Sequence, residues 1–365
     1  MKNSVRIVMA FIGLASLAAA QIVIENPAQP AAKNAGRIIT LKEELRIEDT
    51  GKDFYLKQAW KIRVSPRGDI FVQDGQDQAL LFDPQGRFVR NVLKKGQGPE
   101  EIANLIDIWI SPDLLFLYGT DGKILASDFS GRVIRELPSK ITGWMKFISA
   151  NRDRVLLYKE NRPDPSKGVG RINVPIDIVE VSMADGSHQS IGAFPHQIYF
   201  ELLPGGGSSI TGWNRLHAIS VDPGMILVNA APEYLVEVHS REKKEVIRRF
   251  KRPYQRVKSS GKGGVSGGGN APPPPEFEPD IWDLHFVDGK CWVQTSTVLK
   301  DKGILFDVYD LDGRYLDCFY IPTKNIPSGG KPYNMNMTFS GGFVYFADKN
   351  EDDLVVIRKC RLVGL

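Results

Sequence analysis

The chain has 365 residues, and its 47 lysine and arginine residues nearly balance its 43 aspartate and glutamate residues. That balance excludes a general, charge-driven affinity for nucleic acid, which needs a strongly basic surface. The cysteines are too few for a disulfide framework and lack the CxxC spacing of a metal site. Each cysteine lies in an apolar strand pattern, so we expect buried thiols at Cys291, Cys318 and Cys360. A single disulfide between two of them is the alternative. The length suits one array of repeats or two ordinary domains.

Residues 1–20 have the features of a cleavable export signal. Lys2 and Arg6 precede an apolar run at residues 7–17, which is shorter than the ~20 residues that a transmembrane helix needs. Alanines at 18–20 supply a cleavage site, and no cysteine follows for lipid attachment. We therefore expect a periplasmic or secreted mature chain without membrane insertion, whose residues 21–36 form a flexible lead; an uncleaved anchor helix is the alternative.

A short apolar strand pattern recurs six times in the rest of the chain, at residues 69–74, 114–119, 154–159, 225–230, 290–295 and 342–348. Another strand pattern follows each of these. Where a further strand comes next, an aspartate and a glycine mark the turn, as at residues 83–87, 128–132 and 310–314. Glycine accepts the positive φ of tight antiparallel turns. A repeat of this kind predicts an array of small antiparallel sheets.

The clearest unit is GDIFVQDGQDQALLFDPQGRFVRNVLKKGQGPEEI, residues 68–102. Its glycine, apolar pair and aspartate, followed by a polar loop, an "LFD..G" turn and a glycine-rich exit, resemble the NHL repeat of β-propeller proteins. The resemblance implies an all-β, six-bladed β-propeller over residues 37–365. The sixth unit ends after three strands, and residues 37–47 form an orphan strand pattern before the first unit. We expect this N-terminal strand to complete the last blade and close the ring.

Three segments interrupt or flank the regular spacing. Residues 159–174 are expected to form a long polar loop in the third blade, and residues 194–211 to lead into the fourth. Residues 257–279 are rich in glycine, serine and proline, which predicts a disordered insertion. The basic run at residues 241–258 is expected to be a solvated outer strand, the alternative being a grip on phosphates or an anionic surface.

Polar residues in the first strand of each blade are the candidate ligand-binding residues. In a propeller that strand lines the central channel, where a water-filled bore also tolerates polar groups. Mixed charges and tryptophans there suit a polar small molecule, a sugar or a peptide. The candidates are Lys61, Arg63, Asp107, Trp144, Lys146, Trp213, Arg215, His217, Trp282, Asp283, His285, Asn334 and Asn336.

These patterns favour a monomeric, non-catalytic binding module for a protein, peptide or glycan, with no cofactor. Its ligand would meet the loop-rich face, which carries residues 94–101, the insertion from residue 159 and the loops before Trp213 and Trp282. The alternative is a metal-assisted lactonase or lyase that holds a divalent cation on Asp107, His217, Asp283 and His285. A purely structural envelope protein is a third possibility. Geometry discriminates the first two, because a metal enzyme needs at least three of those side chains to converge.

Overall fold

The computed structural model describes residues 22–49, 51–138, 141, 144–161, 163–164, 170–202, 208–212, 216–222, 224–259, 275–322 and 337–365. For Pro138, Trp144, Ser208–Gly212 and Asp222 it describes the backbone alone. All the regular elements of these residues are strands. Within the same residues, no helix has the length and apolar character that crossing a bilayer requires.

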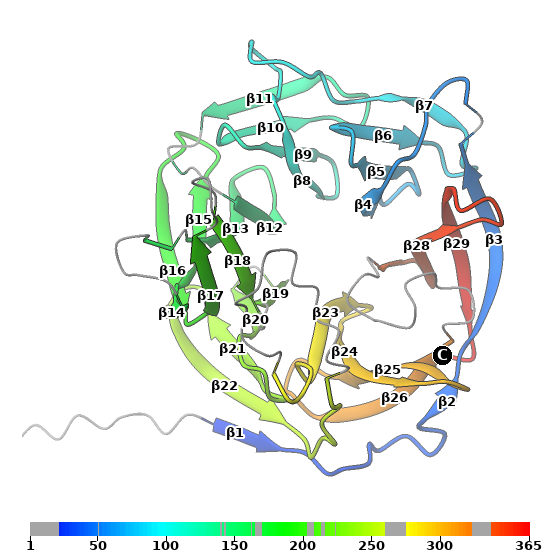
Figure 1. Ribbon diagram of the computed structural model, residues 1–365, viewed down its shortest axis with the longest axis vertical. Coiled ribbons are helices and arrows are strands. Elements are labelled where there is room, and N and C mark those ends of the chain that lie inside the picture. The colour runs from blue at the N-terminus through cyan, green and yellow to red at the C-terminus, as the bar shows by residue number, and fades with distance from the viewer. Residues whose placement is uncertain are drawn as a thin grey trace, which may run out of the picture.

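Six sheets stand in a ring around a central axis, which makes the molecule a six-bladed β-propeller, as predicted (Figure 1). In each blade the strands follow one another antiparallel from the axis outward. Blades one to three comprise β4 (Ala59–Val64), β5 (Ile70–Asp74), β6 (Gln78–Phe82) and β7 (Phe88–Asn91); β8 (Leu105–Ile110), β9 (Leu115–Gly119), β10 (Lys123–Ser127) and β11 (Val133–Pro138); and β12 (Trp144–Ala150), β13 (Arg154–Glu160), β15 (Ile176–Ser182) and β16 (His188–Phe194).

The later blades repeat this order and take up the N-terminal strands at their outer edges. Blades four to six comprise β19 (His217–Asp222), β20 (Met225–Asn229), β21 (Val236–Ser240) and β22 (Glu245–Lys251); β23 (Ile281–Val287), β24 (Lys290–Leu299), β25 (Gly303–Tyr309) and β26 (Tyr315–Ile321); and β27 (Thr338–Ser340), β28 (Phe343–Lys349), β29 (Val355–Val363) and β3 (Thr40–Glu48). Middle strands such as β5 and β9 are buried at every residue, because neighbouring blades cover both faces. The three cysteines are buried and unpaired.

The predicted closure of the ring is confirmed. Strand β3 pairs antiparallel with β29 and becomes the outermost strand of blade six, with Leu41 opposite Leu362 and Ile47 opposite Ile357. The orphan pattern at residues 37–47 is nevertheless two strands, because β2 (Arg37–Ile38) pairs parallel with β26 of blade five. This segment therefore adds a strand to blade five and another to blade six, whereas the sequence predicts a strand in blade six alone.

Residues 22–36 are paired to the ring, which corrects the expectation of a flexible lead. Strand β1 (Ile22–Glu25) pairs parallel with β22 of blade four. The buried Asn26 then donates from Nδ2 to the Gly313 carbonyl at 2.9 Å and accepts from the Tyr315 amide at 2.8 Å. These bonds satisfy backbone groups at the outer edge of blade five. The N-terminal segment is thus a belt along blades four, five and six (Figure 1).

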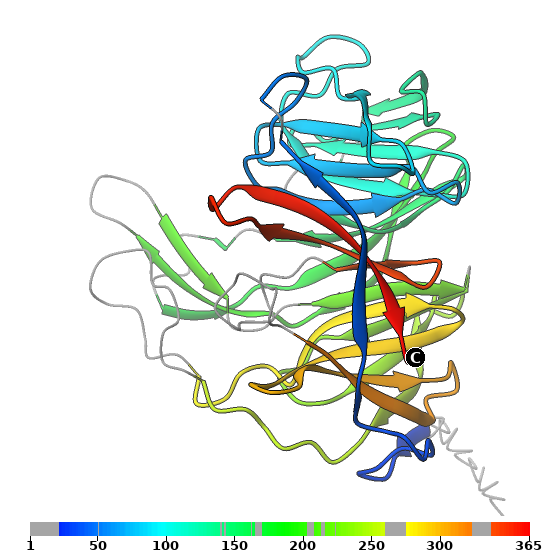
Figure 2. The same cartoon turned by 90° about the vertical axis from the view of Figure 1, so that its right-hand side faces the viewer.

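A seventh sheet lies outside the six blades. Strand β14 (Gly170–Asn173) comes from the insertion expected as a polar loop, and β17 (Gln197–Leu202) and β18 (Ser208–Gly212) come from the lead into blade four. Figure 2 shows this added sheet projecting from one face of the ring. The β5–β6 turn and the insertion between β13 and β15 both join the second and third strands of a blade, so they lie at the same end of the ring. Lys95 Nζ bonds Asp77 in the β5–β6 turn at 2.6 Å. We call this end the loop face, and it carries residues 94–101, as expected.

The basic run at residues 241–258 does not form a solvated outer strand throughout. Strand β22 is covered on its outer side by β1, and the next residue, Arg252, is buried between blades four and five. Its Nη2 lies 2.6 Å from Oδ2 of the fully buried Asp307, which also accepts from the hydroxyls of Tyr234 and Tyr315, each at 2.6 Å. We call these four residues the seam cluster. Burial opposes the charge on Arg252, but Asp307 and the neighbouring tyrosines together outweigh it and raise the pKa.

The predicted disordered insertion is ordered at both described ends. The Ser259 amide donates to the Glu276 carbonyl and the Glu278 amide to the Val257 carbonyl, both at 2.8 Å. Residues 260–274, which hold most of the glycine-rich sequence, lie outside the described residues, and so do residues 1–21.

Candidate ligand-binding channel

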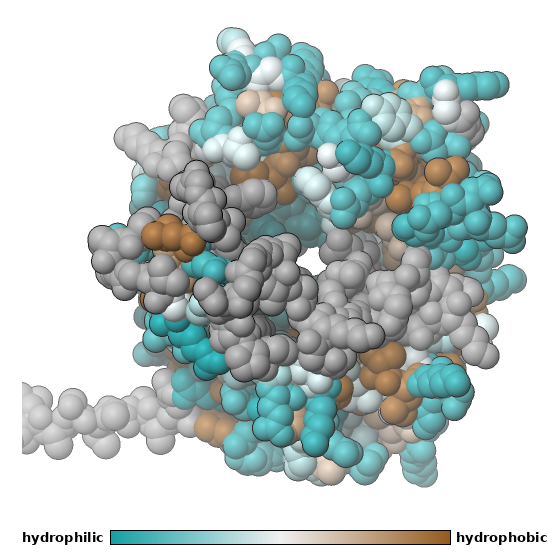
Figure 3. Space-filling view, viewed as in Figure 1, coloured by the Kyte–Doolittle hydropathy of each residue, from teal (hydrophilic) through white to brown (hydrophobic). Residues whose placement is uncertain are grey.

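A cavity of about 790 Å³ occupies the axis of the ring, and all six inner strands contribute to its lining. The space-filling view down the axis shows an opening at the centre of the molecule (Figure 3). His196 and Ile198 also line the cavity, so β17 of the added sheet reaches its loop-face end. Both the central position and the use of inner strands agree with the sequence prediction.

Cross-strand pairing identifies equivalent positions in five blades. At these positions an inner-strand residue lies opposite an amide or phenol side chain of the second strand. The pairs are Lys61 with Gln73, Asp107 with Tyr118, Lys146 with Tyr158, His217 with Asn229, and Asp283 with Gln294. The fold thus builds one ring of polar residues from residues that are far apart in the sequence.

A β-bulge precedes three members of this ring. The pairing register shifts between Ala59 and Lys61 in β4, and equivalent shifts come directly before Asp107 in β8 and Asp283 in β23. A bulge leaves one residue unpaired and re-aims the side chain that follows it. In blade two the bulged residue is Ile106, and a residue of blade one binds it: Gln73 Nε2 donates to the Ile106 carbonyl at 2.9 Å. The inner strands are therefore shaped at the position that presents the polar ring.

Asp107 lies buried behind one wall of the channel and bonds to residues of that wall. It is fully buried, and Oδ2 accepts from the Phe147 amide at 2.8 Å while Oδ1 accepts from the Ile108 amide at 2.7 Å. Oδ1 also forms an ion pair with Lys61 Nζ. Burial lowers the pKa of Lys61 to about 8 despite that pairing, and the nearby Arg63 adds to the shift. Among the described residues, this buried carboxylate thus has an ion pair with one cation, Lys61.

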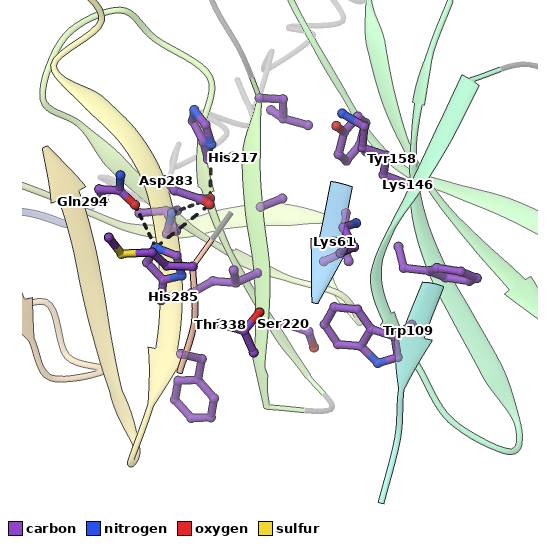
Figure 4. A pocket seen from close by; sticks show the side chains of 18 of the residues that line it. Lys61, Trp109, Lys146, Tyr158, His217, Ser220, Asp283, His285, Gln294 and Thr338 are labelled. Atoms are coloured by element: carbon purple, nitrogen blue, oxygen red, sulfur yellow. Dashed lines mark hydrogen bonds and ion pairs between the residues drawn. The ribbon is translucent and has the colours of Figure 1, made fainter. Parts of the chain in front are cut away.

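Arg63 and Lys146 complete this cationic wall. Figure 4 shows Lys61 and Lys146 on it. The Arg63 guanidinium lies 5.0 Å from the centre of the Trp109 ring. Its Nε is buried without a hydrogen-bond partner in the described part of the chain, and Nη1 has only a long contact, 3.4 Å, to the Ile62 carbonyl. Burial lowers the pKa of Arg63. Lys146 lies over the ring of Tyr158, whose proximity raises the lysine pKa.

The facing wall presents one carboxylate between two histidines (Figure 4). Asp283 Oδ1 lies 3.4 Å from Nδ1 of His217, and Oδ2 lies 4.0 Å from Nε2 of His285. The carboxylate is 47% exposed to the cavity, whereas the two histidines are about 10% exposed. Burial disfavours its charge, but the histidines and the Leu284 amide prevail and lower the pKa of Asp283. His285 is held in turn by Gln294, 3.2 Å away.

The structure brings most of the described candidates together. Asp107 lies buried behind the cavity wall, and seven candidates line the cavity with described side chains: Lys61, Arg63, Lys146, His217, Trp282, Asp283 and His285. For Trp144 only the backbone is described, and Trp213, Arg215, Asn334 and Asn336 lie outside the described residues.

The four residues considered for a metal do not converge. His217, Asp283 and His285 share one wall, whereas Asp107 is bonded to Lys61 and two amides on the other. Over the described residues, no group of three or more histidine, cysteine, aspartate or glutamate side chains has the arrangement of a metal site.

Sequence reasoning missed several lining residues that the same patterns could have supplied. Trp109 is not one of them, because its period-two spacing after Asp107 on β8 already indicates a channel-facing side chain. Tyr158 and Gln294 stand on second strands at the position opposite a ring member, which an alignment of the six units would show. Thr338, whose hydroxyl bonds the Ile62 carbonyl at 2.6 Å, carried no signal in the sequence.

Comparisons with known proteins agree with this architecture. Residues 47–173 match the model of the DUF5128 family, described as a 6-bladed β-propeller. No curated protein matches the chain. A solved structure from Bacteroides fragilis NCTC 9343, named as a candidate exported protein, is similar with a TM-score of 0.52 and 13% identity, covering 93% of this chain and 99% of that one.

Two further solved structures are more distant. The β-propeller domain of Cps50 (Swd1) from Myceliophteria thermophila has a TM-score of 0.43 and 10% identity over 85% of this chain and 87% of that one. The computationally designed Ika8 protein has a TM-score of 0.44 and 10% identity over 93% and 99%. The family match and the structure from Bacteroides fragilis support a six-bladed β-propeller that resembles a candidate exported protein.

Proposed function

We propose that the chain is an exported, NHL-like β-propeller that acts as a non-catalytic binding module. Its ligand, a glycan, a peptide or a segment of a protein partner, would enter the central channel from the loop face. The observation that carries the proposal is the cavity of about 790 Å³, enclosed by two walls of convergent polar side chains with Trp109 among them. Ligand sites commonly have volumes of about 300–1,000 Å³ and a few placed polar groups.

The pairing of the channel side chains favours binding over catalysis. The carboxylate of Asp107 is fully buried and is bonded to Lys61 and to two amides, so it is not open to a substrate. Asp283 stays ionised between its two histidines and so suits a fixed charge better than a general acid. The apolar residues on the same strands, such as Ile148 and Ile219, would contact the uncharged parts of a ligand.

The test is a binding screen of the mature chain, residues 21–365, against tripeptide and oligosaccharide libraries. Wild type would be compared with His217→Ala, which changes the channel, and with Arg132→Met, whose side chain is 80% exposed in an outer turn. We expect a retained ligand class that His217→Ala weakens and Arg132→Met does not. A screen without any ligand, or one insensitive to His217, contradicts the proposal.

Elemental analysis of the same proteins provides an independent outcome. Stoichiometric zinc or calcium in the wild type that disappears from His217→Ala would replace the binding proposal with a metal enzyme. Lactones and esters would then be the substrates to try first.

A further inference from the structure

Two opposite charges face one another across the channel without pairing. Arg63 projects from β4 of blade one and Asp283 from β23 of blade five, and both line the cavity. They are near enough for the Asp283 charge to favour the protonated form of Arg63. Ion pairs of the described residues nevertheless join Asp283 only to its histidines, and none involves Arg63. The cavity therefore holds a positive and a negative group apart.

The cationic wall has capacity for an anion. It carries three cations, Lys61, Arg63 and Lys146, against two carboxylates, the buried Asp107 and the exposed Glu160 beside Lys146. The Arg63 guanidinium lies on Trp109 and has no carboxylate partner in the described part of the chain, although guanidinium groups bind carboxylates in a two-pronged manner. Burial lowers the pKa of Lys61, and Arg63 and Lys146 add to the shift; an incoming carboxylate would offset this crowding of like charges.

The facing wall has capacity for a cation. Oδ2 of Asp283 has its nearest ion-pair partner, His285, at 4.0 Å, which is beyond hydrogen-bond distance. The same carboxylate is half exposed to the cavity and stays ionised at neutral pH. An ammonium group near this oxygen would donate a charge-assisted hydrogen bond to it in a site partly shielded from solvent.

We propose that the channel recognises a zwitterion, namely a short peptide with free ends, whose carboxylate meets Arg63 and the lysines while its ammonium group meets Asp283. This inference rests on the proposed function and names the ligand class of that site. A cavity of about 790 Å³ has room for a short peptide. A neutral sugar would leave both walls unpaired, and a purely acidic ligand would be repelled by Asp283.

The experiment uses tripeptide libraries in three forms, with free ends, with an acetylated N-terminus and with an amidated C-terminus. Each form is tested by equilibrium dialysis against wild type, Arg63→Met, Asp283→Asn and Arg132→Met. We expect blocking of either end to weaken binding at least tenfold. Arg63→Met should weaken the free and acetylated forms but leave the amidated form unchanged, and Asp283→Asn should weaken the free and amidated forms but leave the acetylated form unchanged. Such matched losses identify which wall meets which end.

The controls separate this inference from the proposed function. Thermal melting verifies that each variant folds, and Arg63→Lys, which keeps the charge, replaces Arg63→Met if the latter does not. End-blocked peptides that bind as well as free ones overturn the zwitterion and leave channel binding in place. An acidic oligosaccharide that binds in a manner sensitive to Arg63 but not to Asp283 does the same. Failure of every peptide and oligosaccharide overturns both.

Discussion

Arg252 and Arg63 are two arginines in similar surroundings with very different degrees of pairing. Each lies over aromatic rings close to a fully buried aspartate. Arg252 has two hydrogen bonds to Asp307, from Nε at 2.9 Å and from Nη2 at 2.6 Å. Arg63 has no carboxylate partner in the described residues, because Asp107 is bonded to Lys61.

The difference indicates what each region is for. In the seam cluster every charge has a partner from the chain, so the cluster joins blades four and five and leaves nothing for a ligand. In the channel the same residue types leave a guanidinium without a carboxylate partner on one wall and one carboxylate oxygen, Oδ2 of Asp283, without a close partner on the other, among the described residues. Unsatisfied buried polar groups cost stability, and binding sites are where that cost has a use.

The largest effect is expected in the seam. Arg252→Met removes one partner of a buried ion pair and leaves the Asp307 charge with two tyrosine hydroxyls. The free energy of unfolding should fall by about 3–5 kcal/mol. Urea denaturation at pH 7 measures the shift, with exposed Arg132→Met as the control. A loss below about 1 kcal/mol would mean that the seam cluster does not hold the two blades together.

A smaller loss is expected for the buried carboxylate behind the cationic wall. Asp107→Asn keeps the shape but places an amide nitrogen against a backbone amide, either that of Phe147 or that of Ile108. It also removes the partner of Lys61. The free energy of unfolding should fall by about 2–3 kcal/mol. Asp283→Asn, at the equivalent position but half exposed, should cost less in the same denaturation experiment; equal losses would contradict the contrast between the walls.

These two aspartates show how far the sequence could predict the site. Both follow a bulge on an inner strand, and period-two polar residues were enough to place them at the channel. Their exposure and bonding differ because their neighbours from other blades differ. Lys61 and the Phe147 amide enclose Asp107, whereas two histidines leave Asp283 open. Contacts of that kind form only when the ring closes, so no local pattern predicts them.

The fold likewise has parts that could be predicted from the sequence and parts that could not. The six units could be predicted because each second strand contains a short apolar run, such as Ile70–Val72 in β5. The closing strand could be predicted because the last unit lacked a fourth strand, which β3 supplies. The belt at β1 could not, since four residues without periodicity carry no signal until β22 pairs with them. The added sheet was missed for the same reason, its strands β14 and β17 being short and far apart in sequence.

The contribution of Lys61 to the pH dependence of stability provides a test of the cationic wall. Its pKa in the folded chain, about 8, lies below the ordinary value of 10.5, so the unfolded chain binds more protons between these limits. Stability from this group is therefore present above pH 10.5 and is lost as pH falls through 8. The free energy of unfolding of wild type, relative to Lys61→Met, should rise by about 1–2 kcal/mol from pH 7 to pH 9.5. A flat difference would show that Asp107 fully offsets the burial of Lys61.

The smallest effect on stability is expected at Arg63, where the comparison with Arg252 is most direct. Arg63→Met keeps an apolar stem against Trp109 and removes a charge that has no carboxylate partner in the described residues. The free energy of unfolding should therefore change by less than about 0.5 kcal/mol at pH 7. Because Arg63 contributes to the lowered pKa of Lys61, the pH window of that lysine should also move upward in the variant. A loss as large as that of Arg252→Met would mean that Arg63 is a structural residue with a partner of its own, and would remove the reason to regard its wall as waiting for a ligand.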